Sequence, residues 1–344
     1  MRCTSSFRKK NMPKEKLSLA HYKITAVIPA YKVEKQIAET LARIPDYIWQ
    51  IIVVDDASPD RTGEIVERAK AKDSRITLIK HAKNQGVGGA MISGFREALQ
   101  VGTQVILKVD GDGQMSEYDP RSLLEPLIRG DADYVKGNRF RDFNALKAMP
   151  LIRQIGNMGL GFLVKTATGY WDCFDPTNGF FAIRHEALEL LPLDKVHKSY
   201  FFETSMLGEL YLIGAVIRDV PYPAVYGDEE SNLSVRKTLF EFPPKLTYLF
   251  FRRMLLKNFL FNFSMESIYL LTGFPMLVFG LLFGIVKWIK YFNLGIPAPT
   301  GTIMIPVMLV MLGVQLLLAA ANIDLQSVPK KPLCNGELEG KNEN

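Results

Sequence analysis

The chain has 344 residues, 48% of them hydrophobic, which allows one large domain with appendages or two ordinary domains around a sizeable core. Its formal net charge of +6 suits phosphate-bearing ligands, nucleic acid or anionic lipid and does not choose among them. The three cysteines form no CxxC pair and the four histidines form no HExxH or HxxxH pattern, which argues against a disulfide framework, a zinc knuckle and a histidine-ligated metal.

The first 22 residues are polar and basic, and no apolar run follows them directly. This is not the pattern of a signal peptide, and we expect a flexible tail that can touch lipid headgroups. From residue 24 onward, short apolar runs alternate with amphipathic segments. We predict a buried strand at 24–28 and further strands at 51–54, 76–79 and 105–109.

Helices are predicted between these strands. The first carries apolar residues on one face between 37 and 44, and the second begins at Ser58–Pro59, with Ser as the cap and Pro at the first helical position. A third follows a glycine-rich turn, and Asp119–Pro120 opens a fourth. Strands that alternate with helices indicate an α/β domain with a mostly parallel sheet covered on both faces. In such sheets, ligands bind at the carboxyl ends of the strands.

The last third of the chain has a different composition. Two stretches, 268–286 and 303–321, are each 19 residues long and contain no charged residue. Each is about long enough to cross a bilayer as a helix. A buried core helix could be equally apolar, but two such stretches in succession near a C-terminus favour two transmembrane helices.

Residues 236–265 combine basic and aromatic side chains, as helices in a membrane interface do, although a core helix with a solvated face is the alternative. The basic residues that flank the two apolar stretches are Arg252, Arg253, Lys257, Lys330 and Lys331. They predict that both flanks are cytoplasmic and that the connector at 293–300 faces outward. Lys287 and Lys290 lie on the outward side and oppose this orientation.

The segment Asp110-Gly-Asp-Gly-Gln114 follows the fourth predicted strand. Two carboxylates one residue apart, with glycines that allow a sharp turn, form a site for a hard divalent cation. Mg²⁺ and Mn²⁺ prefer oxygen ligands and share them with substrate phosphates. A solvated turn is the alternative, and the position at the end of a strand favours the metal site.

Two other polar segments follow predicted strands. Asp55 and Asp56 end the second strand and could accept hydrogen bonds from a ribose or a base, or simply begin a helix. The run from Asn84 to Ala90 contains glycines that would let the backbone approach a ligand closely. It is similar to a dinucleotide fingerprint, but that fingerprint should follow the first strand, where this chain has Pro29-Ala-Tyr.

Four segments, Pro29–Tyr31, Val53–Asp56, Asn84–Ala90 and Asp110–Gln114, occur in this order and at characteristic spacing. Together they resemble the GT-A glycosyltransferases of family 2, and especially the polyprenyl-phosphate sugar transferases of the dolichol-phosphate mannose synthase type. The resemblance covers roughly residues 23–235. It implies a GT-A fold, which is Rossmann-like with a mostly parallel sheet, followed by interfacial helices and C-terminal spans.

The resemblance also implies roles for individual residues. The implied nucleotide-sugar contacts are Pro29, Ala30, Tyr31, Glu34, Asp55, Asp56, Asn84, Gly88 and Asp110. The implied ligands of Mg²⁺ or Mn²⁺ are Asp110, Asp112 and Gln114. The implied catalytic residues are Asp112, Arg139 near the acceptor phosphate, Asp175 beside the sugar, and Glu203. The chain departs from the family at Lys32 and Val33, where the family usually has Asn-Glu, and at Tyr226 and Asn232, where it often has Arg and Lys.

These observations predict five regions. They are a basic tail at 1–22, a GT-A catalytic domain at 23–235, amphipathic juxtamembrane helices at 236–265, two transmembrane helices at 266–324 and a cytoplasmic tail at 325–344. Two spans cannot form a wide channel, so translocation of a product would need a partner or an oligomer. We expect no nucleic-acid partner, because the basic residues concentrate beside the spans.

The resulting hypothesis is an inverting glycosyltransferase at the cytoplasmic face of a membrane. It would move a sugar from a nucleotide-diphosphate sugar to a polyprenyl phosphate such as undecaprenyl or dolichyl phosphate. Two alternatives stay open: a family 2 transferase that acts on a lipid-linked saccharide or another glycan, and a nucleotide-binding membrane protein without catalysis. The intact Asp110 and Asp112 pair argues against the second alternative.

Overall fold

The computed structural model describes residues 18–113, 119–138, 151–176, 178–222, 235–334, 336–338 and 340, and the predicted residues Gln114, Arg139, Tyr226 and Asn232 lie outside them. The chain forms two compact units. The first comprises residues 1–249 and 329–344, and the second comprises residues 250–328. The boundary therefore falls inside a helix, and residues beyond the predicted spans belong to the first unit.

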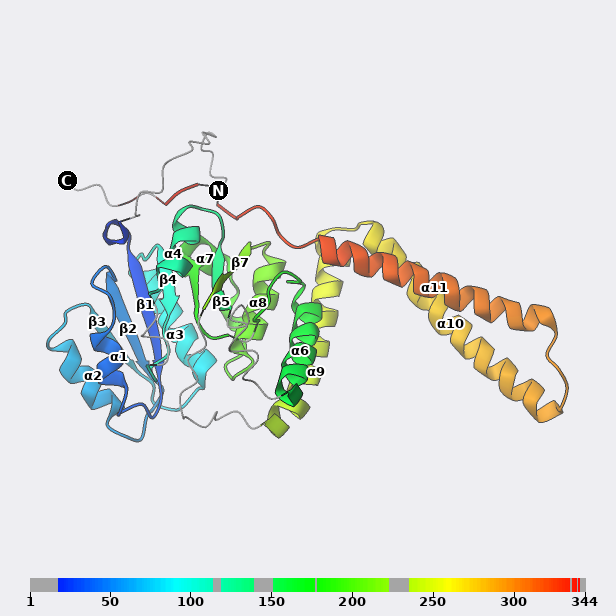
Figure 1. Cartoon of the computed structure of the whole chain (residues 1–344), viewed down its shortest axis with the longest axis horizontal. Helices are drawn as coiled ribbons and strands as arrows, with labels where there is room; N and C mark the ends of the chain where they lie inside the picture. The colour runs from blue at the N-terminus through cyan, green and yellow to red at the C-terminus, as the bar shows by residue number, and fades with distance from the viewer. Residues whose placement is uncertain are drawn as a thin grey trace. The chain divides into compact units, whose positions relative to one another are not determined.

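The first unit is built on one sheet (Figure 1). Within the described residues the sheet has seven strands in the order β3-β2-β1-β4-β6-β5-β7. The strands are β1 (Ile24–Ala30), β2 (Gln50–Asp55), β3 (Ile76–Lys80), β4 (Val105–Lys108), β5 (Tyr134–Asn138), β6 (Phe181–Arg184) and β7 (Ile217–Pro221). All pairs are parallel except those of β6 with β4 and with β5. The predicted mostly parallel α/β fold is confirmed.

Helices of the first unit connect these strands. They are α1 (Ile37–Ala42), α2 (Thr62–Lys70), α3 (Val87–Gln100), α4 (Arg121–Ile128), α6 (Leu151–Thr168), α7 (His185–Leu190), α8 (Phe202–Leu212) and most of α9 (Val235–Leu255). Successive side chains of a strand point to opposite faces, and every residue from Ile24 to Ile28 in β1 is buried. Helices therefore cover both faces of the central strand. On one face, α3 packs so closely that a Cβ at Gly94 would lie 2.3 Å from Cγ1 of Val27.

One predicted helix start is wrong. The helix α2 begins at Thr62, whereas Ser58–Pro59 form part of the preceding loop. The carboxylate of Asp60 accepts hydrogen bonds from the backbone N–H of Thr62 at 3.2 Å and from its Oγ1 at 2.7 Å. The cap-like role predicted for Ser58 is therefore taken by Asp60, because residues 56–60 are occupied by the turn that leaves β2.

The second unit is a helical hairpin of α10 (Met265–Leu294) and α11 (Thr300–Gln326), preceded by a π-helix at Leu256–Phe261. Both helices are long and apolar enough to cross a bilayer, with mean hydropathies of 2.1 and 2.5. Only 11% and 17% of their most apolar windows are buried, whereas a core helix of a soluble protein is mostly buried. Gly313 allows the helices to touch, since a Cβ there would lie 2.7 Å from the backbone N of Leu277.

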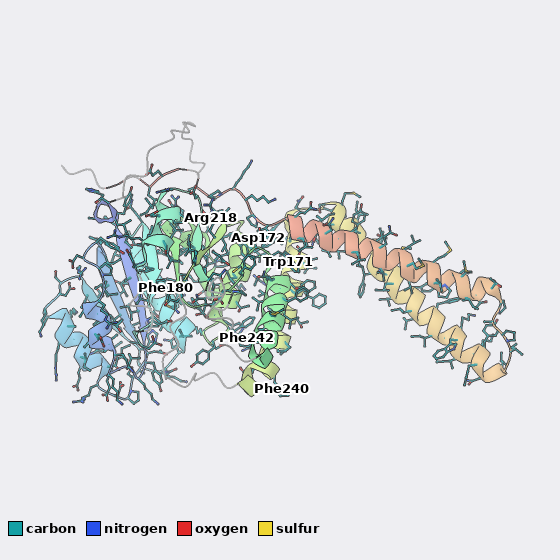
Figure 2. All side chains as sticks on the ribbon, in the orientation of Figure 1. Trp171, Asp172, Phe180, Arg218, Phe240 and Phe242 are labelled. Atoms are coloured by element: carbon teal, nitrogen blue, oxygen red, sulfur yellow. The ribbon has the colours of Figure 1, made fainter. Side chains whose placement is uncertain are left out.

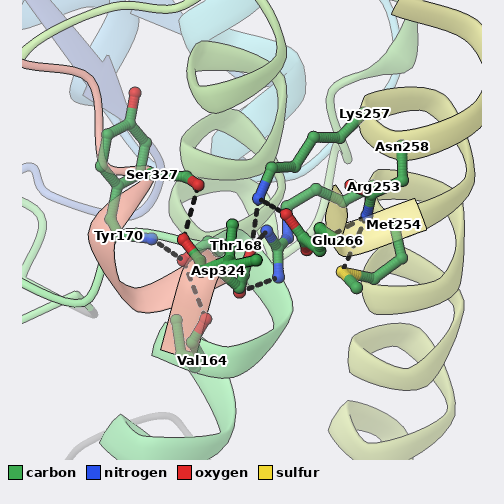
Figure 3. Close-up of polar contacts among 11 residues, drawn as sticks. Val164, Thr168, Tyr170, Arg253, Met254, Lys257, Asn258, Glu266, Asp324 and Ser327 are labelled. Carbon is green, nitrogen blue, oxygen red and sulfur yellow. Dashed lines mark hydrogen bonds and ion pairs between the residues drawn. The ribbon is translucent and has the colours of Figure 1, made fainter. Parts of the chain in front are cut away.

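A group of buried charges lies inside the second unit (Figure 3). We name Arg253, Lys257, Glu266 and Asp324 the hairpin cluster. The Arg253 guanidinium donates to both oxygens of Asp324 at 2.7 and 3.0 Å, and the Lys257 ammonium lies 2.7 Å from Asp324 and 2.9 Å from Glu266. The Asn258 amide also donates to Glu266 at 3.2 Å. Two cations and two anions thus join the π-helix region to α10 and α11.

Residues after α11 return to the first unit. The backbone N–H of Leu333 donates to the carboxylate of Asp133 at 3.0 Å, and that of Leu338 donates to the carbonyl of Ile128 at 2.8 Å. The Arg184 guanidinium donates to the carbonyl of Gly336 at 3.3 Å. The helical hairpin therefore leaves the first unit and comes back to it.

Candidate active site

A pocket of about 910 Å³ lies at the carboxyl ends of β1, β2 and β4. The predicted site residues that line it are Pro29, Ala30, Tyr31, Asp56, Asn84, Asp110 and Asp112. The other lining residues are Lys32, Val33, Gln36, Gly86, Val87, Ala90, Gly111, Ser199 and Tyr200. Parallel strands place their carboxyl ends along one edge of the sheet, so segments that are distant in sequence meet here.

Asp110 and Asp112 both face this pocket, directly beyond the end of β4. The side chain of Asp110 is 28% exposed. Within the described part of the chain, no group of three or more His, Cys, Asp and Glu side chains surrounds a common point. Two carboxylates beside an open pocket fit Mg²⁺ or Mn²⁺, because such ions keep waters and bind substrate phosphates at their other positions.

The neighbouring aspartates have different environments. Asp55 lies outside the pocket lining, and its Oδ1 accepts the backbone N–H of Ser58 at 3.0 Å. Asp56 borders the pocket, yet its carboxylate holds the following turn: it accepts the N–H groups of Gln85 and Gly86 at 2.8 Å each and lies 2.6 Å from Nδ1 of His81. Its contacts make Asp56 a support for the pocket wall. No motif or spacing predicts a role for His81, because only the fold brings it to Asp56.

The glycine-rich turn packs against another part of the protein backbone. A Cβ at Gly88 would lie 2.2 Å from the carbonyl of His197, and one at Gly86 would lie 2.7 Å from that of Lys198. Gly86 also has a φ of +82°, which favours glycine. Gly88 is outside the pocket lining, whereas Asn84 is part of it. In the structure these two glycines therefore admit the segment at 197–199, which carries Ser199 to the pocket.

Glu34 also lies outside the pocket lining. Its carboxylate accepts the backbone N–H of Arg61 at 3.0 Å and lies 3.6 Å from Nε of the same residue. Glu34 thus joins the loop after β1 to the loop before α2. Glu34 follows Lys32 and Val33, the two positions at which the chain departs from the family. Its contact with Arg61 gives it a structural role.

A fully buried lysine at the end of β4 contacts one carboxylate of the pocket, Asp110, and one outside the pocket lining, Glu203. Nζ of Lys108 lies 2.7 Å from Oδ1 of Asp110 and 3.6 Å from Oε1 of Glu203. Burial lowers the pKa of Lys108, but the charges of Asp110 and Glu203 outweigh burial, and the pKa is raised above its ordinary value. The structure therefore brings Glu203 to the Asp110 side of the site. Sequence analysis missed Lys108, although a lysine that ends an apolar strand signals a need for carboxylate partners.

Asp175 lies deeper, with no exposed surface. It is one of the acidic groups whose charges act on Lys136, a buried lysine in β5. Burial lowers the pKa of Lys136, although nearby acidic groups, including Glu203 and Asp219, oppose this effect. The register pairs Lys136 with Asp219 of β7 and with Phe181 of β6, and Phe181 also pairs with Lys108. One register row of the sheet thus carries two lysines and an aspartate, with Phe181 between the lysines.

The comparisons with known proteins agree with this fold. The model of glycosyl transferase family 2 matches residues 25–191. A UDP-N-acetylglucosamine–dolichyl-phosphate N-acetylglucosaminyltransferase of Methanococcus voltae is 32% identical over 49% of this chain and 72% of its own length. An undecaprenyl-phosphate mannosyltransferase of Micrococcus luteus is 30% identical over 58% of this chain and 82% of its own length. The chain belongs to glycosyltransferase family 2, and it is a glycosyltransferase.

Among solved structures, a mannosyltransferase of Pyrobaculum calidifontis in complex with GDP-Man and Mn²⁺ is 15% identical to this chain. The match covers 88% of this chain and 87% of that protein, with a TM-score of 0.40.

Proposed function

We propose that the enzyme transfers a sugar from a nucleotide-diphosphate sugar to a polyprenyl phosphate, with inversion at the anomeric carbon. The observation that carries this proposal is the pocket that joins Asp110 and Asp112 to the ends of β1 and β2, in a chain whose relatives act on dolichyl and undecaprenyl phosphates. The pocket volume of about 910 Å³ is in the range of ligand sites.

The donor would lie with its nucleotide against Pro29–Tyr31 and its diphosphate beside Asp110 and Asp112. A divalent cation, Mg²⁺ or Mn²⁺, would neutralise charge on the leaving diphosphate when bound. The chain's own contribution is to hold the donor and to orient the two carboxylates. Tyr31 is 44% exposed at the pocket and offers a ring face to the base.

A lipid phosphate is already anionic at neutral pH, so its oxygen can attack without a strong general base. Positioning and charge stabilisation would then dominate the rate enhancement. Arg139, which follows β5 directly in sequence, is our candidate for holding that phosphate. If the acceptor were a saccharide hydroxyl, a base would be needed, and Asp175 or Glu203 would be the candidate; Glu203 shares Lys108 with Asp110, whereas Asp175 is fully buried.

Exposed apolar side chains support a membrane location. In the first unit, α6 exposes Met158, Phe162 and Leu163. Figure 2 shows Phe240 and Phe242 near one end of α9; Phe240 is 79% exposed, whereas Phe242 is buried with its ring centroid 5.2 Å from that of Phe201. Such amphipathic helices suit a membrane interface, and α10 and α11 suit its apolar interior.

The return of the chain bears on topology. Because residues on both sides of the hairpin belong to the first unit, α10 and α11 would cross the bilayer as a pair and place the connector opposite the active site. Arg253 and Lys257 are paired within the hairpin cluster, but the orientation rule counts basic residues and not net charge, so both still count. Together with Lys330 and Lys331 they favour a cytoplasmic catalytic unit, and we propose this orientation.

The test is a transfer assay on the detergent-solubilised full chain with Mn²⁺, a panel of radiolabelled nucleotide sugars and a polyprenyl phosphate. We expect label in the lipid extract, lost by about 10²-fold or more in Asp112→Asn if this carboxylate stabilises the leaving diphosphate. Label on a lipid-linked saccharide alone would replace the proposed acceptor. Transfer that is equal in wild type and Asp112→Asn would contradict the proposed site.

A further inference from the structure

Three separate elements converge on the ammonium group of Lys108. It belongs to the last residue of β4, two positions before Asp110. Its side chain is only 2% exposed, and its Nζ lies 2.7 Å from Oδ1 of Asp110 and 3.6 Å from Oε1 of Glu203 on α8. The ring of Phe181 in β6 has its centroid 5.9 Å from the same nitrogen.

The space for this ammonium depends on a glycine. A Cβ at Gly179 would lie 2.6 Å from Nζ of Lys108, 3.3 Å from Oδ2 of Asp110 and 3.6 Å from Oε1 of Glu203. Gly179 has no positive φ, so its backbone conformation does not require glycine. The absence of a side chain at this position therefore serves the lysine and the two carboxylates that surround it.

We propose that Lys108 is a positioning residue that holds the Asp110 carboxylate for the divalent cation. By binding Oδ1, the ammonium fixes the rotation of the carboxylate at the pocket edge, where the side chain is 28% exposed. Lys108 also links Asp110 to Glu203, so the two acidic groups keep a defined separation before any ligand arrives. Nothing in the family resemblance assigns this role, and the inference rests on the proposed metal site.

Supporting groups of this kind matter for metal affinity. Partners that hydrogen-bond a ligating side chain fix its orientation, and their removal typically weakens metal binding by about 10–100-fold. A purely electrostatic role predicts the opposite sign, because removing a cation beside two carboxylates strengthens their attraction for Mn²⁺. The direction of the change therefore separates positioning from simple charge balance.

The experiment measures Mn²⁺ binding by the detergent-solubilised full chain, from the electron paramagnetic resonance signal of free Mn²⁺, with and without UDP or GDP. Lys108→Met removes the ammonium, and Gly179→Ala displaces it while the lysine remains. Gly161→Ala is the matched control, because a Cβ at that helical position meets nothing within 4 Å. Near-ultraviolet circular dichroism reports folding, and Gly179→Ala decides the test if Lys108→Met does not fold.

We expect about 10–100-fold weaker Mn²⁺ binding in Lys108→Met and Gly179→Ala, and wild-type binding in Gly161→Ala. Unchanged or tighter binding in the folded variants would overturn the inference while the proposed function stands. If the wild type bound no Mn²⁺, or if Asp112→Asn bound it as tightly as the wild type, the proposed metal site and this inference would fail together. Weaker binding in Asp112→Asn with unchanged binding in Lys108→Met and Gly179→Ala would overturn the inference alone.

Discussion

The two units of this protein bury charged side chains in different ways. In the hairpin cluster, Arg253 and Lys257 face Glu266 and Asp324, so the charges balance, and the side chains are between 0% and 17% exposed. Beside the pocket, one ammonium from Lys108 contacts two carboxylates, and the carboxylate at the pocket edge, Asp110, is 28% exposed. The comparison indicates that balanced and covered charges hold elements together, whereas an acidic excess at a pocket edge is available to a ligand.

The largest effect should come from breaking the balanced cluster. Arg253→Met removes the bidentate partner of Asp324, and we expect about 3–5 kcal/mol lower stability, because a buried charge is left undercompensated. Thermal unfolding in detergent measures the change. Arg43→Met, which breaks an exposed pair with Glu39, is the control and should cost at most about 0.5 kcal/mol. If Arg253→Met lost no more stability than Arg43→Met, this result would contradict a structural role for the hairpin cluster.

The double variant Arg253→Met/Asp324→Leu sharpens this prediction. Replacing a buried ion pair by apolar side chains of similar size is often neutral or stabilising. We therefore expect the double variant to regain most of the stability lost in Arg253→Met, with Lys257 still paired to Glu266 at 2.9 Å. Additive losses, measured by the same unfolding experiment, would show that the pair is needed for more than charge compensation.

At the pocket, we expect a substitution to lower activity more than stability. Glu203→Gln removes one of the two carboxylates around Lys108, and we expect at least about tenfold lower transfer, equal to about 1.4 kcal/mol of barrier. Because Lys108 keeps its closer partner Asp110 at 2.7 Å when Glu203 is replaced, stability should change by less than about 1 kcal/mol. Initial rates and unfolding temperatures test both halves. If Glu203→Gln kept full activity and lost stability, the contact between Glu203 and Lys108 would serve to hold the fold together, as the hairpin cluster does.

The smallest effect should come from an ion pair near the returning tail, in which Arg184 is buried and the Glu186 side chain is 31% exposed. Burial raises the pKa of Glu186, but hydrogen bonding and charge from Arg184 outweigh it, and the pKa is lowered below its ordinary value of 4.5. The ion pair therefore stabilises the fold above pH 4.5 and loses this contribution as the pH falls through the lowered pKa. Glu186→Gln should cost about 0.5–1 kcal/mol at pH 7.

Unfolding experiments between pH 7 and pH 3 check this dependence. The difference between wild type and Glu186→Gln should shrink toward zero at the acid end. Glu189→Gln on the same helix is the control, since its side chain is 71% exposed and its partner His185 lies 4.0 Å away. A constant difference at every pH would show that Glu186 acts through packing instead of charge.

Sequence patterns predicted much of the catalytic unit. Apolar runs located β1 to β4, because a buried strand needs consecutive apolar residues on both faces. Uncharged stretches located α10 and α11, although the helices extend beyond them on both sides. Because ligands bind at the carboxyl ends of parallel strands, the sequence predicted a site at Asp110 and Asp112, and the structure places both in one pocket with Pro29 and Tyr31. These features depend on local periodicity and on general rules of sheet topology.

The tertiary structure decided what each polar group contacts. It assigned Gly88 to close backbone packing, Asp56 to support of a turn, and Glu34 to a loop contact. It also revealed Lys108 and returned the tail to Asp133 across 200 residues of sequence. Local patterns determine which segments are strands, helices or spans because backbone geometry repeats every few residues. Partners of buried charges are determined only when distant segments pack, because their pairing has no period in the sequence.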